Sequence, residues 1–77
     1  MNQVKGRIML LYYYVNTTPK IDGRYEVHAI GCVQTPLIKT SSPLGEFASC
    51  QEAINAAQLN YPKATGCYYC CKECYTS

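Results

Sequence analysis

The chain has little of what enzyme active sites commonly use. It has one histidine, His28, and one aspartate, Asp22, and its four glutamates form no paired pattern. A Cys-His-Asp arrangement would need both of these single residues at one site. We therefore expect a protein that is not an enzyme.

The chain also lacks a strong excess of positive or negative charge. Seven Lys and Arg stand against five Asp and Glu, which gives a formal net charge of +2. The basic residues are scattered and form no run or stripe, unlike the basic footprint of a dedicated nucleic-acid binder. Nucleic-acid binding therefore stays an alternative, and a protein is the expected partner.

Long hydrophobic runs are missing. The apolar stretch at 8–15 is interrupted by three tyrosines and is far shorter than the roughly 20 residues that span a bilayer. No small-residue cleavage site follows it, as one would after a secretory signal. We expect a cytoplasmic protein without a membrane partner.

Cysteine, in contrast, is abundant. A chain of 77 residues has room for one small domain, 1–77, and domains of this size often add a metal or disulfides to a limited core. Four of the six cysteines lie between residues 67 and 74. In a reducing compartment, such clustering indicates a metal before it indicates disulfides.

The residue pattern predicts an α+β fold. Residues 8–15 and 24–29 are typical of strands and flank an Asp22-Gly23 turn, so they are expected to form an antiparallel hairpin. In the second strand, period two places His28 on the face opposite Val27. Residues 33–43 are expected to be a loop, and 44–47 a short third strand.

A helix is predicted at 50–60. Ser49 and Glu52 form a capping box, in which Glu52 reaches back to the amide of Ser49, and Pro62 ends the helix. Its small apolar residues share one face with Tyr61. We expect a small antiparallel sheet, one packed helix and a C-terminal cysteine knuckle.

Two spacings point to a metal site. Cys67-x2-Cys70 is the usual bidentate zinc knuckle, and His28-x3-Cys32 supplies two further ligands. Fully extended, His28 and Cys32 would lie about 13 Å apart, so the chain must turn between them, which Gly31 permits. Three thiolates and one imidazole would form a closed, structural Zn²⁺ site.

The other cysteines leave alternatives open. Cys71-x2-Cys74 overlaps the knuckle, and Cys50 and Cys74 are a candidate pair. Cys50 at the helix start is either a thiol with a lowered pKa or, as we favour, a small buried apolar residue. A secreted disulfide-stapled domain and a redox or iron–sulfur role compete with zinc. A thioredoxin-like motif should follow a strand, however, and an iron–sulfur cluster leaves His28 unexplained.

Eight residues are tyrosines, gathered at 12–14 and 68–69. Tyrosine clusters serve base stacking or protein binding, since tyrosine is favoured at interfaces. In a small domain they also fill the core and shield a metal, which is the interpretation that we favour. A sheet face left uncovered by the helix remains a candidate protein-binding surface.

The chain combines three short motifs, which are H-x3-C at His28 and Cys32, L-G-x-F-x2-C from Leu44 to Cys50, and G-C-x2-C from Gly66 to Cys70. This combination resembles a family of small bacterial proteins. The family often has Cys-His where this chain has Cys74-Tyr75, and often lacks a cysteine at Cys71. The resemblance implies that Cys71 is not a framework residue.

The ligand order is also remotely similar to the zinc-binding domain of the Ada DNA-repair protein. Its Cys-x3-Cys and Cys-x2-Cys ligands fall on His28, Cys32, Cys67 and Cys70. The methyl-accepting thiolate falls on His28, whose imidazole is not that nucleophile. The similarity therefore implies the metal-binding architecture and not the repair chemistry. We expect a non-enzymatic, zinc-stabilised module that binds another protein.

Overall fold

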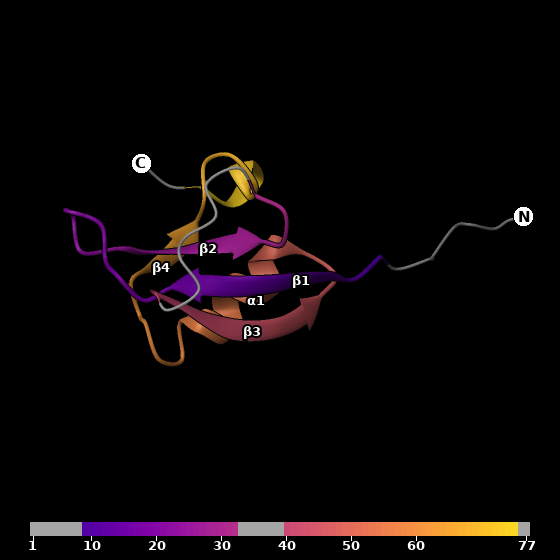
Figure 1. Ribbon diagram of the computed structural model, residues 1–77, viewed down its shortest axis with the longest axis horizontal. Helices are drawn as coiled ribbons and strands as arrows, with labels where there is room; N and C mark the ends of the chain where they lie inside the picture. Colours follow the sequence, from indigo (N-terminus) through magenta and orange to yellow (C-terminus); the bar gives the residue numbers. More distant parts are fainter. Residues whose placement is uncertain (1–8, 33–39, 76–77) are drawn as a thin grey trace, which may run out of the picture.

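A computed structural model of the chain describes residues 9–32 and 40–75. It has four strands, β1 (Leu11–Asn16), β2 (Tyr25–Ala29), β3 (Ser41–Phe47) and β4 (Ala64–Gly66), with α1 (Cys50–Ala57) and a short 3-10 helix η2 (Lys72–Cys74). The strands form one sheet in the order β3-β1-β2-β4, with α1 behind it in the view of Figure 1. The expected α+β class is confirmed.

Strands β1 and β2 form the expected antiparallel hairpin. Tyr13 lies opposite Ala29, and Val15 lies opposite Val27. In the connecting turn the Arg24 amide donates to the Asp22 side chain, and Gly23 adopts a φ of 88°, which glycine tolerates without strain. The predicted strand started at Ile8, which lies outside the described residues. In the part of the chain that the structure describes, β1 begins at Leu11.

Strand β3 is longer than predicted. It begins at Ser41 and includes Pro43, which the sequence placed in the loop 33–43; positions 33–39 of that loop lie outside the described residues. Pro43 has no amide hydrogen to donate, and an edge strand is where a sheet tolerates this. The register shift between Tyr13 and Tyr14 absorbs the irregularity.

The sheet is mixed, whereas the sequence predicted an antiparallel sheet. Strand β4 pairs parallel with β2, with Tyr25 opposite Ala64 and Val27 opposite Gly66. The three residues of β4 have no strand pattern of their own, so their conformation follows from docking against β2. This pairing brings the C-terminal cysteines beside the end of β2.

Helix α1 ends at Ala57, earlier than the predicted residue 60. The amides of Leu59 and Asn60 bond three residues back, that of Asn60 to the Ala57 carbonyl at 3.1 Å, so the chain tightens between the helix and Pro62. The Ser49 hydroxyl accepts from the Glu52 amide at 3.3 Å, as predicted. The Glu52 carboxylate accepts from the Ala48 amide, however, and not from that of Ser49.

The core lies between α1 and one face of the sheet. The spacing placed Tyr61 on the apolar face of the helix, but it lies after the helix. The centroid of its ring is 4.7 Å from that of Tyr25. With regard to membranes, no helix among the described residues is long and apolar enough to cross one. The buried side chains of the core are Tyr13, Val15, Val27, Ala29, Cys50, Ala53, Ile54, Ala57, Ala64 and Cys71.

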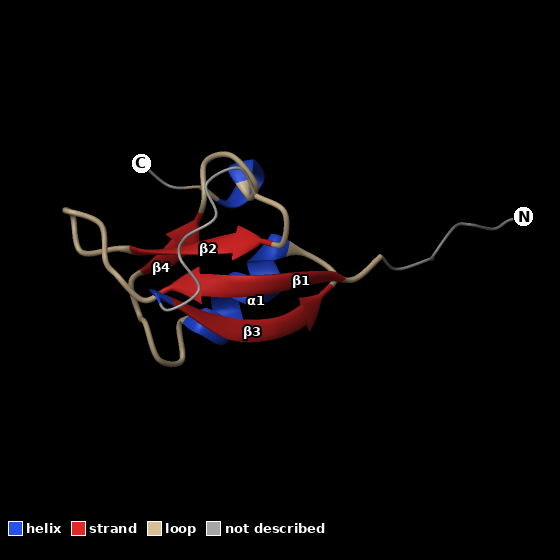
Figure 2. Ribbon diagram, in the orientation of Figure 1, coloured by secondary structure: helices blue, strands red, loops and turns tan. Residues whose placement is uncertain are grey.

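A disulfide fastens the C-terminal tail to the start of α1. It joins Cys50 to Cys74 across 24 residues of sequence. The tail also packs closely on Gly66, where an added Cβ would lie 2.9 Å from the Cβ of Cys71. Figure 2 shows that η2 lies near the C-terminal end of β2.

Candidate metal centre

All four predicted metal ligands come from the region where β2 and β4 end. His28 is the penultimate residue of β2, and Cys67 directly follows β4. The Cys67 amide donates to the Val27 carbonyl at 3.0 Å and so continues the parallel pairing by one residue. Because parallel neighbours end at the same edge of a sheet, the two halves of the ligand set meet there.

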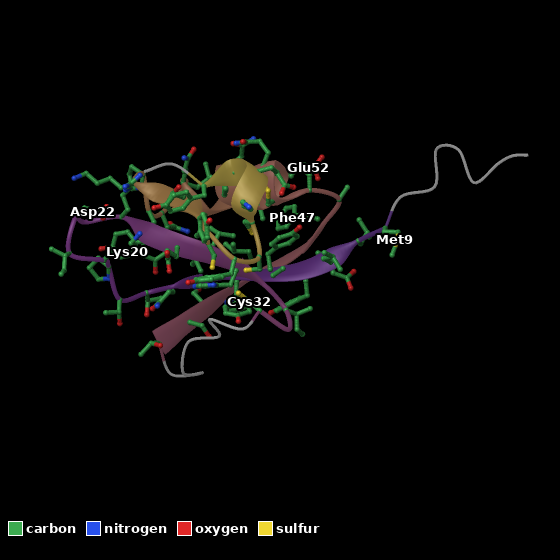
Figure 3. All side chains as sticks on the ribbon, turned by 90° about the horizontal axis from the view of Figure 1, so that it is seen from above. Met9, Lys20, Asp22, Cys32, Phe47 and Glu52 are labelled. Atoms are coloured by element: carbon green, nitrogen blue, oxygen red, sulfur yellow. A yellow bond between two sulfur atoms is a disulfide. The ribbon has the colours of Figure 1, made fainter. Side chains whose placement is uncertain are left out.

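The chain turns between His28 and Cys32, as the spacing argument required. The Cys32 amide donates to the Ala29 carbonyl at 3.2 Å, and Gly31 has a φ of 85°. A side chain at that φ would be strained, so glycine suits this position of the turn. Figure 3 places Cys32 between Lys20 at one end of the molecule and Met9 at the other.

The four ligand atoms lie close enough together to hold one metal ion. The ligand atoms of His28, Cys32, Cys67 and Cys70 all lie within 4.8 Å of one another. The Cys32 and Cys67 sulfurs are 3.7 Å apart, and the Cys70 sulfur is 3.9 Å from His28 Nδ1. With Zn–S bonds of about 2.3 Å and a Zn–N bond of about 2.0 Å, tetrahedral geometry requires about 3.8 Å between two sulfurs and about 3.5 Å between a sulfur and the nitrogen. The residues present therefore fit an ion of this size.

Burial and hydrogen bonds act on the thiols in opposite directions. Burial raises the pKa of the Cys67 thiol and that of Cys70. Backbone amides lower both pKa values, because the Tyr69 amide points at the Cys67 sulfur (3.4 Å) and the Ala29 amide at the Cys70 sulfur (3.3 Å). Burial prevails, so an incoming metal must displace protons from these thiols.

His28 is held as a neutral, oriented ring. Its side chain is 1% exposed, and burial lowers the pKa of the imidazole, which Glu26 partly offsets. The ring stacks on Tyr14, with centroids 5.6 Å apart. Neutral imidazole is the form that ligates metals.

The sequence reasoning did not identify Glu26 as part of this region. The carboxylate oxygen Oε1 of Glu26 lies 3.7 Å from Nε2 of His28. A signal was available, because the period of two puts residues 26 and 28 on the same face of a strand.

The remaining cysteines divide into a bonded pair and a buried thiol. Cys50 and Cys74, a candidate pair in the sequence, form the disulfide, so Cys50 is not merely a buried apolar residue. Cys71 is a free thiol, fully buried in the core, and burial raises its pKa. It is not part of the four-residue ligand cluster.

An aromatic cluster covers the knuckle. Tyr68 and Tyr69, the two residues between Cys67 and Cys70, are 47% and 62% exposed. The Tyr68 ring contacts the rings of Tyr69 and Tyr75 edge to face, at 5.2 Å and 5.3 Å. In the other predicted cluster, Tyr13 is buried in the core, whereas Tyr12 is exposed.

Comparisons with protein-family models, with curated proteins and with solved structures found no match. The resemblance to the small bacterial family and the remote similarity to the Ada-type domain therefore stay predictions. The geometry of the Cys and His cluster is the basis for a functional assignment.

Proposed function

We propose that this protein is a non-enzymatic domain whose C-terminal tail is fixed by a structural Zn²⁺ ion. His28, Cys32, Cys67 and Cys70 would hold the ion. The convergence of their four ligand atoms within 4.8 Å of one another carries this proposal. When bound, the ion would join the end of β2 to the knuckle after β4.

The donor set favours zinc and a structural role. Three thiolates and one imidazole suit a tetrahedral Zn²⁺ ion, and they leave no open position for a substrate or an activated water. Three of the four ligand residues are also buried. Such a site contributes to folding rather than to catalysis.

Metal analysis with two neighbouring variants tests the site. Native mass spectrometry of the wild type is expected to show one zinc ion. Thiol counting after denaturation and chelation is expected to find four thiols, those of Cys32, Cys67, Cys70 and Cys71. Cys70→Ala should abolish zinc binding, whereas Cys71→Ala, one residue away, should retain it.

A wild type without bound metal would refute the zinc site. Equal zinc content in the two variants would remove Cys70 from the ligand set. Oxidation of the ligand thiols to disulfides would favour the disulfide-stapled alternative.

The aromatic cluster on the knuckle supports a role in protein binding. Tyr68 and Tyr69 expose large rings, and tyrosine is enriched in interface hot spots. A nucleic-acid partner would need free cations beside these rings. Lys72 lies 5.6 Å from the centre of the Tyr68 ring. Lys20, 5.6 Å from the centre of the Tyr75 ring, lies 3.5 Å from a Glu26 oxygen and is therefore partly neutralised.

Site-specific photocrosslinking tests the protein-binding role. A crosslinker at position 69 is expected to capture a partner protein that one at position 55, on the exposed side of α1, does not. Tyr69→Ala should then weaken the purified complex by at least tenfold, the usual effect of losing a hot spot. Capture only of nucleic acid, with a steep loss of affinity in salt, would instead favour the nucleic-acid alternative.

The disulfide favours a second proposal, that the protein works in an oxidising compartment. Disulfides persist in oxidising compartments and are rare in the cytoplasm, where the sequence placed the protein. Thiol trapping in intact cells tests this: a Cys50–Cys74 bond present in freshly quenched cells supports an oxidising compartment, and reduced thiols there support the cytoplasm.

A further inference from the structure

The two nitrogens of His28 face different groups. Nδ1 is the nitrogen that lies 3.9 Å from the Cys70 sulfur, within the ligand cluster. Nε2 lies on the other side of the ring, 3.7 Å from Oε1 of Glu26. Among the described residues, this buried Nε2 has no hydrogen-bond partner.

A neutral imidazole that ligates through one nitrogen carries its hydrogen on the other. If Nδ1 is the ligand, the hydrogen is on Nε2 and needs an acceptor in a buried place. The Glu26 oxygen is the acceptor at hand, only slightly beyond hydrogen-bond length.

Strand geometry holds Glu26 in this position. Residues 26 and 28 share one face of β2, since side chains alternate along a strand. The second carboxylate oxygen, Oε2, lies 3.5 Å from the Lys20 ammonium. Lys20 in turn lies 5.6 Å from the centre of the Tyr75 ring. One oxygen of Glu26 is therefore anchored by Lys20 while the other faces His28.

We propose that Glu26 is the carboxylate that orients His28 as a metal ligand, by accepting the Nε2 hydrogen and leaving Nδ1 to bind the ion. The inference rests on the metal site proposed above and adds to it the ligating nitrogen and a positioning residue. Carboxylates in this position fix the tautomer and the ring orientation, and they make the ligating nitrogen a stronger donor.

Long-range ¹H–¹⁵N NMR spectra of the zinc-loaded wild type test the assignment without any variant. The expected pattern for His28 is a metal-bound Nδ1 and a protonated Nε2. A metal-bound Nε2 would overturn the inference while leaving the zinc site intact. A wild type that binds no zinc would overturn both.

Metal affinity, measured by competition with a chromophoric chelator, tests the role of Glu26. Glu26→Ala is expected to weaken zinc binding about 10–100-fold. Glu26→Gln, which keeps an acceptor oxygen but loses the charge, should weaken it less. Glu46→Ala, which removes an exposed strand glutamate, is the matched control and should leave the affinity unchanged.

The absorption spectrum of the cobalt-substituted protein separates orientation from folding. In Glu26→Ala, the cobalt bands should change in shape, because the imidazole is less firmly oriented, while the thiolate bands persist. Glu26→Ala and Glu46→Ala with equal affinities and identical spectra would show that Glu26 serves only as the ion-pair partner of Lys20, and would overturn the inference.

Discussion

At the scale of single residues, the buried thiols make metal binding a competition with protons. Burial raises the pKa of Cys67 and of Cys70 above the value of an ordinary thiol, so both are protonated at neutral pH when no metal is bound. Burial lowers the pKa of His28, so the imidazole is already neutral there. The thiols, and not the histidine, therefore set how metal affinity responds to pH near neutrality.

Zinc affinity is accordingly expected to fall as the pH is lowered. The metal-free protein binds protons at the thiols that the zinc-bound protein lacks, so acidification favours the metal-free form by linkage. The expected change is up to about tenfold per pH unit for each displaced proton. Chelator competition between pH 8 and pH 6 measures the slope. A flat profile would show that the ligand thiols are already ionised without metal.

The four residues of the Cys and His cluster could be predicted to lie together from the sequence because they follow spacing rules. Cys67-x2-Cys70 is a local motif, and His28 is the only histidine in the chain. The role of Glu26 depends on which way the His28 ring points, and that depends on where the tail docks. Spacing within the sequence does not contain this information.

At the scale of elements, the start of α1 is fixed by two side chains. The Ser49 hydroxyl caps the Glu52 amide, and the Glu52 carboxylate accepts from the Ala48 amide. An eight-residue helix is too short to be stable by itself, so these bonds and its buried face hold it in place.

Ser49→Ala is expected to lower the free energy of unfolding by about 1 kcal/mol, because an amide of the first turn loses its acceptor. Urea unfolding with the disulfide intact measures the loss. Ser49→Asp is the matched control, since aspartate is an equally good cap and should keep most of the stability. Equal losses in both variants would mean that position 49 acts through something other than capping.

Elements with local signals could be predicted, and those built by distant pairing could not. The hairpin follows from two strand patterns around Asp22-Gly23, and α1 follows from its cap and its apolar face. Strand β4 is three residues long and exists through its pairing with β2. The first residues of β3 were predicted to be part of a loop because of Pro43. They form a strand instead because they pair with β1.

At the scale of the whole molecule, the disulfide and the ligand cluster hold the same tail at different places. Cys74 ties it to the start of α1, while Cys67 and Cys70 face β2 and the turn that follows it. The tail thus has one covalent attachment, and the proposed zinc ion would add a second.

Removing the disulfide with Cys50→Ala and Cys74→Ala is expected to lower the free energy of unfolding by about 3 kcal/mol. The closed loop spans 24 residues, and its loss restores chain entropy to the unfolded state. Denaturant unfolding in the presence of chelator measures the difference. Cys71→Ala, which removes a buried thiol but no crosslink, is the control, and a loss no larger than that of the control would contradict the prediction.

The distance along the chain between the two halves of the ligand cluster bears on folding kinetics. Cys32 and Cys67 are 35 positions apart, and His28 and Cys70 are 42 apart, with β3 and α1 between them. Contacts that close such long loops form late, after local hairpins and helices. A bound ion is therefore expected to act mainly on the folded state and little on the folding transition state. It would lengthen the lifetime of the folded protein while leaving the folding rate almost unchanged.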